Sequence, residues 1–394
     1  MRPSILAGLK LASPVLIGSG PPTSKLEFLK HAEKCGAGGA SLKLTFKTVP
    51  FRGQLRSYSL PGRVLVFPID KRLDLEEGVD LARKARNETS LVLFSNLGAV
   101  GANIREWIEI ADAFEKAGCH AHELNFCCPN LDITSLDKRT EEANHGGSMI
   151  SQNADSCYDI TRAVKEASGI PVFCKIVPNV SDIETIVRAC QAGGADGIHI
   201  VGNPTWGLPP INLECDGKPA IELLEGASYG AANGSICKYS TYKVVAQVAR
   251  AVNIPVIASG GLDDWRDCAS AIMWGASATA VCSAPMWFGF EVVRHMVDDL
   301  DAYMSRKGYQ SVEEIRGLSL QYLTTPDKLV IKEGTSVIDA DKCTNCGRCT
   351  KPCHCDAITM IDEKAQVEAE RCIGCGVCVN LCPVGAIQLK PEQD

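Results

Sequence analysis

Short apolar runs alternate with amphipathic stretches along the first three quarters of the chain. We expect strands in eight of these runs, which read PVLIGSG, GASLKLTF, SLVLFSN, AHELNF, PVFCKIV, GIHIV, IPVIASGG and TAVCSA. Helical patterns separate them, over residues 24–35, 104–117, 153–168, 182–192, 241–252 and 265–274. Strands that are apolar on both faces and alternate with helices predict a parallel sheet.

The number of strands decides between two parallel architectures. Eight strands separated by helices favour a closed (β/α)8 TIM barrel over an open doubly wound sheet. An extra apolar run over residues 63–67 fits an excursion between the second and third units. We therefore predict an α/β fold with the barrel over residues 1–305, a linker or docking segment over 306–334 and a small α+β domain over 335–394.

Length, charge and hydrophobicity exclude several classes of protein. The 394 residues, 45% of them hydrophobic, suffice for one large and one small domain. The net charge of -7, without a long basic block, argues against nucleic acid as the main partner. Lys10 interrupts the N-terminal apolar run and no run of about 18 apolar residues exists, so we expect neither a signal peptide nor a membrane span. These features predict a cytoplasmic protein.

The chain holds 20 cysteines, and two groups of them form an internal repeat. Both groups have the spacing C-x2-C-x2-C-x3-C, and they end in CHCDAI and CPVGAI. Two such runs together hold two [4Fe-4S] clusters. The first three cysteines of a run bind one cluster, and the fourth crosses to the other cluster. Paired zinc sites would need two pairs with a longer gap, and disulfides do not suit a reducing compartment.

The crossing rule assigns the ligands of each cluster. The first cluster takes Cys343, Cys346, Cys349 and Cys382, and the second takes Cys372, Cys375, Cys378 and Cys353. Cys355 could replace Cys353, although the Ala-Ile pair that ends both copies supports Cys353. His354 stands where the second copy has a proline.

Catalytic residues of such barrels lie where strands end and loops begin, so the strand ends carry the candidate site. These ends hold Gly18, Ser19, Lys43, Asn96, Asn125, Cys127, Cys128, Lys175, Asn203, Gly260, Gly261, Cys282 and Ser283. A buried ammonium without a partner is too costly, so the two lysines predict an anionic or polar guest. The Gly-Gly pair after the seventh strand, with Ser283 after the eighth, predicts a phosphate on bare backbone N–H groups; a tight turn alone is the plainer alternative.

The stretch ELNFCCPN resembles the Glu-Leu-Asn-x-Ser-Cys-Pro signature of the dihydroorotate dehydrogenase superfamily. The order of barrel and double-cluster segment, with FCKIVPNVSDI, GGADGIH, IASGGLDD and SVEEIRGLSL, is similar to the FMN and iron–sulfur subunits of NAD(P)-dependent dihydropyrimidine dehydrogenases. This resemblance covers nearly the whole chain, and it implies FMN in the mouth of the barrel.

The resemblance also implies roles for single residues. Lys43 and Lys175 would contact the flavin, Asn125, Asn130 and Asn203 would bind flavin or substrate, and Cys128 would donate a proton. Gly260, Gly261, Cys282 and Ser283 would cradle the phosphate, and Gly18, Ser19 and Asn96 complete the predicted cofactor site.

The residue types fit this chemistry independently of the family. Reduction of an electron-poor C=C bond needs a hydride on one carbon, here from flavin N5, and a proton on its neighbour. The Cys128 thiol, on a loop over the substrate, can deliver that proton, although a free cysteine is often only a packing residue. Lys175 would stabilise the negative charge that develops on the flavin. We interpret His122 and His199, which lie within strands, as core histidines.

Three departures from the superfamily pattern affect the substrate. Cys127 stands where the signature has Ser, the stretch around Pro68 lacks a substrate-binding Asn, and Pro204 follows Asn203 where the family has Thr or Ser. Buried hydrogen-bonding edges left unpaired are costly, so a pocket without these partners should discriminate poorly for a pyrimidine ring.

The chain lacks a strand-G-x-G-x-x-G-helix fingerprint, so its electrons must come from elsewhere. We expect a partner subunit with FAD and NAD(P)H, in a hetero-oligomer or a homo-oligomer, that passes electrons through the clusters to FMN. The leading hypothesis is reduction of a pyrimidine base to its dihydro form. The alternatives are a related reductase of another cyclic or aromatic-acid substrate, oxidation of dihydroorotate, and an electron-transfer subunit without substrate chemistry.

Overall fold

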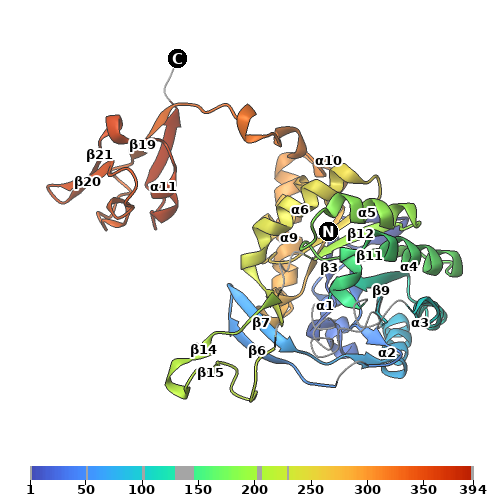
Figure 1. Ribbon diagram of the computed structural model, residues 1–394. Coiled ribbons are helices and arrows are strands. Elements are labelled where there is room, and N and C mark those ends of the chain that lie inside the picture. Colours follow the sequence, from blue (N-terminus) through green and yellow to red (C-terminus); the bar gives the residue numbers. More distant parts are fainter. Residues whose placement is uncertain are drawn as a thin grey trace. The chain divides into compact units, whose positions relative to one another are not determined.

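The computed structural model describes residues 2–49, 52–99, 103–128, 146–201, 206–228 and 230–391 (Figure 1). The chain divides into two compact units, Met1–Tyr322 and Leu323–Asp394. The predicted linker, residues 306–334, contains the boundary between them. The helix α10 (Val312–Ile315) belongs to the first unit, because Val312 and Ile315 pack with Leu300 and Met304 of α9 (Glu291–Lys307).

The first unit is a closed ring of eight parallel strands, which confirms the predicted (β/α)8 barrel. Around the ring the order is β3 (Val15–Ile17), β4 (Gly39–Ser41), β9 (Val92–Leu97), β10 (Ala121–Phe126), β11 (Val172–Ile176), β12 (Gly197–Val201), β17 (Val256–Ser259) and β18 (Ala278–Val281). Parallel pairing of β18 with β3 closes the ring. Each strand falls in one of the eight predicted runs, with β9 and β18 extending one residue beyond theirs, because strands buried on both faces read as continuous apolar segments.

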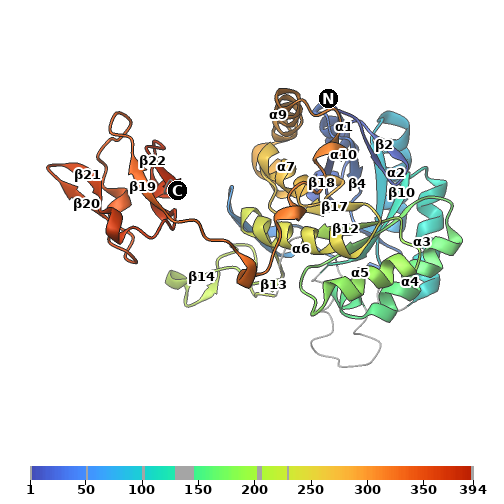
Figure 2. The same ribbon diagram turned by 90° about the horizontal axis from the view of Figure 1, so that it is seen from above.

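Helices surround the strands, as Figure 2 shows from above. They are α1 (Leu26–Lys34), α2 (Leu75–Glu88), α3 (Ile104–Lys116), α4 (Ala154–Ala167), α5 (Ile183–Ala192), α6 (Lys238–Ala251), α7 (Trp265–Met273), α8 (Ser283–Phe288) and α9. Six of them match the predicted helical patterns. We did not predict α2, although the Asp74 side chain accepts from the Glu77 backbone in a capping box that marks its start.

Apolar side chains fill the N-terminal end of the barrel. Leu16, Phe94, Phe173 and Ile257 pack there in one buried cluster with the hairpin of β1 (Ser4–Leu6) and β2 (Leu9–Leu11). The rings of Phe94 and Phe173 meet edge to face, with their centroids 5.3 Å apart. This packing leaves the C-terminal ends of the strands as the place for polar side chains.

Two excursions from the barrel form a separate antiparallel sheet beside its mouth. Its strands, in spatial order, are β13 (Trp206–Gly207), β16 (Gly230–Asn233), β7 (Val64–Ile69) and β6 (Arg56–Leu60). The extra run predicted over residues 63–67 falls in β7. Two shorter pairs lie outside this sheet. β5 (Thr45–Phe46) pairs with β9 of the barrel and with β8 (Leu73–Asp74), and β14 (Ile211–Asn212) pairs with β15 (Lys218–Pro219).

The second unit consists of two antiparallel strand pairs and short helical turns. β19 (Gly334–Ile338) pairs with β22 (Ile387–Pro391), and β20 (Ile358–Ile361) pairs with β21 (Lys364–Val367). One helical turn, α11 (Val377–Leu381), lies within the second cysteine run. This small α+β unit agrees with the predicted ferredoxin-like domain. Within the part of the chain that the structure describes, none of the helices is long and apolar enough to cross a membrane.

Candidate active site and cluster sites

A cavity opens at the C-terminal ends of the barrel strands. Its lining includes nearly all the strand-end residues predicted for the site, namely Gly18, Ser19, Lys43, Asn125, Cys127, Cys128, Lys175, Gly260, Gly261, Cys282 and Ser283. Asn96 does not line the cavity but lies behind it, where its amide oxygen accepts a hydrogen bond from Asn125 Nδ2 at 2.9 Å. Asn130 and Asn203, together with Pro204, lie outside the described residues.

Beneath the cavity, a buried carboxylate holds one of the two lysines. Glu123 Oε1 lies 2.8 Å from Lys175 Nζ, and Glu123 Oε2 lies 2.5 Å from His199 Nδ1. The other ring nitrogen of His199 lies 3.0 Å from the Ser259 hydroxyl, which confirms His199 as a core histidine with hydrogen-bond partners. Sequence reasoning did not assign a role to Glu123, because its partners Ser41, Asn96, Lys175 and His199 come from four other strands.

The charges of this group are fixed by their mutual contacts. Burial alone would raise the pKa of Glu123, but Lys175 and His199 hold that pKa well below its usual range. Burial likewise opposes the charge on Lys175, yet the attraction of Glu123 raises the Lys175 pKa above its ordinary value. Burial lowers the pKa of His199. The cavity floor therefore carries a permanent ammonium held by a permanent carboxylate.

The second lysine belongs to a network that sequence reasoning missed. Lys43 forms a buried ion pair with Asp70, and Arg72 Nη1 lies 3.5 Å from Asp70 Oδ2. Burial, together with the nearby Arg72 charge, lowers the pKa of Lys43 against the opposing effect of Asp70. Asp70 and Arg72 lie between β7 and β8 and both line the cavity. No motif or periodicity marks them, although charged residues after an apolar strand were visible in the sequence.

Arg72 brings a guanidinium to the candidate proton donor. Its Nη2 donates to Cys128 Sγ at 3.1 Å, and the Cys128 side chain is buried in the cavity wall. The Asn125 amide oxygen accepts from the backbone N–H of Cys128 at 3.0 Å and of Cys127 at 3.3 Å. Asn125 thereby fixes the turn on which the two thiols lie. Burial raises the pKa of the Cys127 thiol to about 12, so this neighbour remains protonated.

The seventh strand ends in a backbone cradle suited to an anion. Gly260 and Gly261 have φ angles of +112° and +74°, which residues other than glycine rarely adopt. A Cβ on Gly261 would lie 2.6 Å from Lys238 N and 2.7 Å from Gly234 O. The bare backbone beside Ser283 at this end of the barrel fits a phosphate group, and the buried lysines fit a ring that gains negative charge on reduction. The donor set therefore fits FMN.

One polar atom in the wall indicates a further ligand contact. Among the residues that the structure describes, the buried Nδ2 of Asn233 has no hydrogen-bond partner. Asn233 lies on β16 and lines the cavity next to Gly234. A buried amide donor without a partner is costly, so an acceptor oxygen of a bound molecule is expected there.

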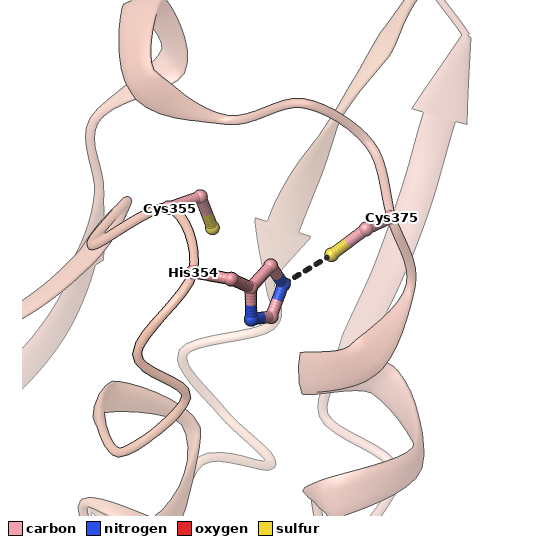
Figure 3. Close-up of side chains that lie close together, drawn as sticks. All are labelled: His354, Cys355 and Cys375. Atoms are coloured by element: carbon pink, nitrogen blue, oxygen red, sulfur yellow. Dashed lines mark hydrogen bonds between the residues drawn. The ribbon is translucent and has the colours of Figure 1, made fainter.

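The second unit contains two smaller cavities lined by cysteines. The first is lined by Cys343, Cys346, Cys349 and Cys382, which is the set predicted for the first cluster. The second is lined by Cys349, Cys355, Cys372, Cys375 and Cys378, together with His354. Cys353, the predicted fourth ligand of the second cluster, does not line it, whereas Cys355 does (Figure 3).

Comparison with known proteins agrees with both units. The dihydroorotate dehydrogenase family matches the chain over residues 77–304, and the 4Fe-4S dicluster domain matches it over residues 336–389. A flavin is the cofactor expected for that family, and the dicluster domain implies iron–sulfur clusters. These matches confirm the resemblance to the dihydroorotate dehydrogenase superfamily that the sequence motifs indicate.

Curated relatives extend the likeness over most of the chain. The NAD-dependent dihydropyrimidine dehydrogenase subunit PreA of Escherichia coli (strain K12) is 26% identical over 366 residues, which cover 88% of this chain and 84% of the relative. The catalytic subunit of dihydroorotate dehydrogenase B (NAD(+)) of Pyrococcus abyssi is 29% identical over 325 residues, which cover 80% of this chain and 98% of the relative. The same subunit of Bacillus mycoides is 28% identical over 316 residues, which cover 80% of this chain and 95% of the relative. The chain therefore belongs to the dihydroorotate dehydrogenase family and is an oxidoreductase of the kind that acts on CH–CH bonds.

Proposed function

We propose that this chain reduces a carbonyl-conjugated C=C bond, with a pyrimidine base such as uracil or thymine as the leading substrate. The observation that carries this proposal is the Cys128 thiol, which lines the cavity at the end of β10 with Arg72 at 3.1 Å. A buried thiol beside a guanidinium can give up its proton and leave a stabilised thiolate. Relatives whose names include dihydropyrimidine dehydrogenase support the pyrimidine ring.

FMN bound in the cavity would supply the hydride. The chain's own residues would do the rest: Gly260, Gly261 and Ser283 hold the phosphate end, and Lys43 and Lys175 hold the ring. Because Glu123 keeps Lys175 charged, its ammonium would stabilise negative charge on the bound ring. These residues thus bind and polarise a flavin without taking part in bond making.

Cys128 performs the proton transfer in this proposal. The S–H bond breaks, the proton passes to the carbon next to the one that receives the hydride, and the electron pair remains on sulfur. Arg72 stabilises that charge, and Asn125 keeps the turn in place through the backbone N–H of Cys128. Solvent returns the proton before the next turnover.

Electrons reach the site, in this proposal, through two [4Fe-4S] clusters in the second unit and a partner subunit that carries FAD and binds NAD(P)H. The two cysteine-lined cavities support the cluster count. The names of both kinds of relative describe one subunit of an NAD-linked enzyme, which supports the presence of a partner subunit. Unaided reduction of the substrate by NAD(P)H with the single chain would refute this part.

Arg72 favours a second candidate, oxidation of a ring that carries a carboxylate, as in dihydroorotate. A guanidinium in the wall of a cavity can bind a carboxylate through two parallel hydrogen bonds. Relatives named dihydroorotate dehydrogenase B match the barrel unit. In this direction Cys128 would accept the proton as a thiolate.

The decisive experiment reduces the bound FMN anaerobically and asks which compound reoxidises it. The panel contains uracil, thymine, orotate and unrelated enones, and the flavin absorbance reports reoxidation. Reoxidation by uracil or thymine supports the proposal, reoxidation by orotate alone supports the second candidate, and reoxidation by none of them refutes both.

Removal of the thiol tests the acid role. Cys128→Ala should keep normal flavin binding and flavin reduction but lose reoxidation by the substrate, because no proton donor remains. Cys127→Ser serves as the matched comparison, since it changes the adjacent sulfur and restores the residue of the family signature. Full turnover by Cys128→Ala would refute the acid role of Cys128.

A further inference from the structure

A group of three possible metal ligands lies away from the mouth of the barrel, where α1 and α9 meet. A ring nitrogen of His31, the sulfur of Cys35 and a carboxylate oxygen of Glu291 all lie within 4.8 Å of one another. These residues line neither the cavity at the mouth of the barrel nor the two cysteine-lined cavities. We propose that they bind a zinc ion that links the two helices.

The end of α1 places two of the ligands on one face. His31 and Cys35 are four residues apart, and the Cys35 backbone N–H donates to the His31 carbonyl oxygen at 3.0 Å. The helical turn therefore continues through Cys35, although α1 itself ends at Lys34. Side chains four residues apart share a face of a helix, and histidine pairs with this spacing bind zinc in other proteins.

Glu291, the first residue of α9, supplies the third ligand from the facing helix. Its Oε1 accepts a hydrogen bond from Cys35 Sγ at 3.5 Å and lies 3.9 Å from His31 Nε2. Arg294 Nε donates to the other oxygen, Oε2, at 2.8 Å, so it orients the carboxylate with Oε1 toward the residues of α1. The ring of Phe290 packs against the His31 imidazole, with the centroids 5.2 Å apart.

The mixed donor set selects the metal. One imidazole nitrogen, one thiolate and one carboxylate suit zinc, whereas calcium and magnesium prefer oxygen ligands alone. The ligand atoms of a tetrahedral zinc ion lie about 3.3 to 3.6 Å apart, so a contraction of about 1 Å brings the three atoms into place. The side chains of His31 and Glu291 are 53% and 57% exposed, which allows this movement. A water molecule would complete the four ligands.

The thiol proton marks the place that the cation would take. Burial, together with Glu291, raises the pKa of Cys35, so without a metal the thiol keeps its proton and donates it to Glu291 Oε1. A zinc ion would displace this proton and contact sulfur and oxygen directly. Arg294 Nη2 lies 3.8 Å from the sulfur, but this side chain is 44% exposed, so solvent screens its repulsion of the ion.

The position of the site indicates what the ion would do. Parallel pairing of β18 with β3 closes the barrel, and α9 packs on β3. Cys35 and Glu291 are 256 residues apart in the sequence, so an ion between them links the first part of the closed ring to the last. Because the unfolded chain lacks this site, a bound ion stabilises the folded barrel.

The test uses the full chain with its flavin and clusters assembled, freed of loosely bound metal and then titrated with zinc chloride. Elemental analysis gives the zinc content, and X-ray absorption at the zinc edge gives the ligands without interference from iron. The wild type should bind about one zinc ion per chain, with one sulfur at about 2.3 Å. His31→Ala and Glu291→Gln should each weaken binding by at least about tenfold, and His295→Ala, at another exposed histidine on α9, should not.

Each outcome supports or overturns the proposal. Binding of zinc by His31→Ala or Glu291→Gln with the affinity of the wild type overturns it, and so does a wild type that binds no zinc. A shell of four sulfur atoms would place the ion on the cluster cysteines and overturn it as well. Zinc should also raise the melting temperature of the wild type by on the order of 5 °C, and an equal rise in His31→Ala would overturn the link between the helices. Cys35 is buried, so the two variants at exposed side chains decide even if Cys35→Ser does not fold.

Discussion

The buried pair of Glu123 and Lys175 allows the sharpest prediction of stability. Glu123→Gln keeps the size of the side chain but removes a charge that lies 2.8 Å from Lys175 Nζ. At an effective dielectric constant of about 20, two unit charges at this distance attract by about 6 kcal/mol. Breaking a buried pair by removing one partner typically costs about 3 to 5 kcal/mol, because the other charge remains buried. We expect the melting temperature to fall by on the order of 10 °C.

The matched control removes a carboxylate from an exposed pair. Glu109 pairs with Lys47 and Arg105 at the surface, so Glu109→Gln should change the melting temperature little. Thermal unfolding monitored by circular dichroism compares the two variants at the same pH. If Glu123→Gln melts no lower than Glu109→Gln, the reasoning about the buried charge is refuted.

The same pair predicts a pH dependence whose sign follows from the two shifts. The pKa of Glu123 is depressed from its usual 4.5, so its contribution is present above 4.5 and is lost as the pH falls toward the folded-state pKa. The pKa of Lys175 is raised from 10.5, so its contribution is present below 10.5 and is lost as the pH rises through the folded-state pKa. Glu123→Gln should therefore unfold with a shallower acid limb than the wild type. Acid limbs of equal slope would contradict this expectation.

Three further changes test the site and the second cluster. Arg72→Met should slow reoxidation of the reduced flavin by about 10- to 150-fold, because a charged hydrogen bond to Cys128 contributes about 1.5 to 3 kcal/mol. Rapid-mixing spectroscopy measures the reoxidation rate, and a change of less than about twofold would contradict this role of Arg72. Gly261→Ala should lower the flavin content per chain, because its Cβ would meet backbone at 2.6 Å; full flavin content would argue against the phosphate cradle. His354→Phe should lower the potential of the second cluster by about 40 mV through loss of a hydrogen bond to Cys375, and a redox titration that shows no shift would refute this role.

The barrel and most of its mouth could be predicted from the sequence because each strand corresponds to a short apolar run. The apolar runs define the eight strands, and in a (β/α)8 barrel their C-terminal ends necessarily meet. Lys43, Asn125, Cys128 and Lys175 line one cavity for this reason. Asn96, which lies within β9, does not line it; its side chain contacts Asn125 and Glu123 instead.

The other residues of the site depend on contacts between segments that lie far apart in the sequence. Asp70 and Arg72 reach the cavity from an excursion whose path the strand pattern does not determine. Glu123 was visible in the signature, but its role follows only when β10, β11 and β12 stand side by side and bring Lys175 and His199 to it.

The second cluster shows the same limit within a single motif. Spacing and the shared Ala-Ile pair favoured Cys353, since two copies of one sequence motif are expected to fold alike. The copies do fold alike at the left-handed turn, yet His354 contacts Cys375 in one copy where the other has a proline. A repeat therefore predicts where the backbone turns, whereas the contacts of single side chains around the turn depend on residues that differ between the copies.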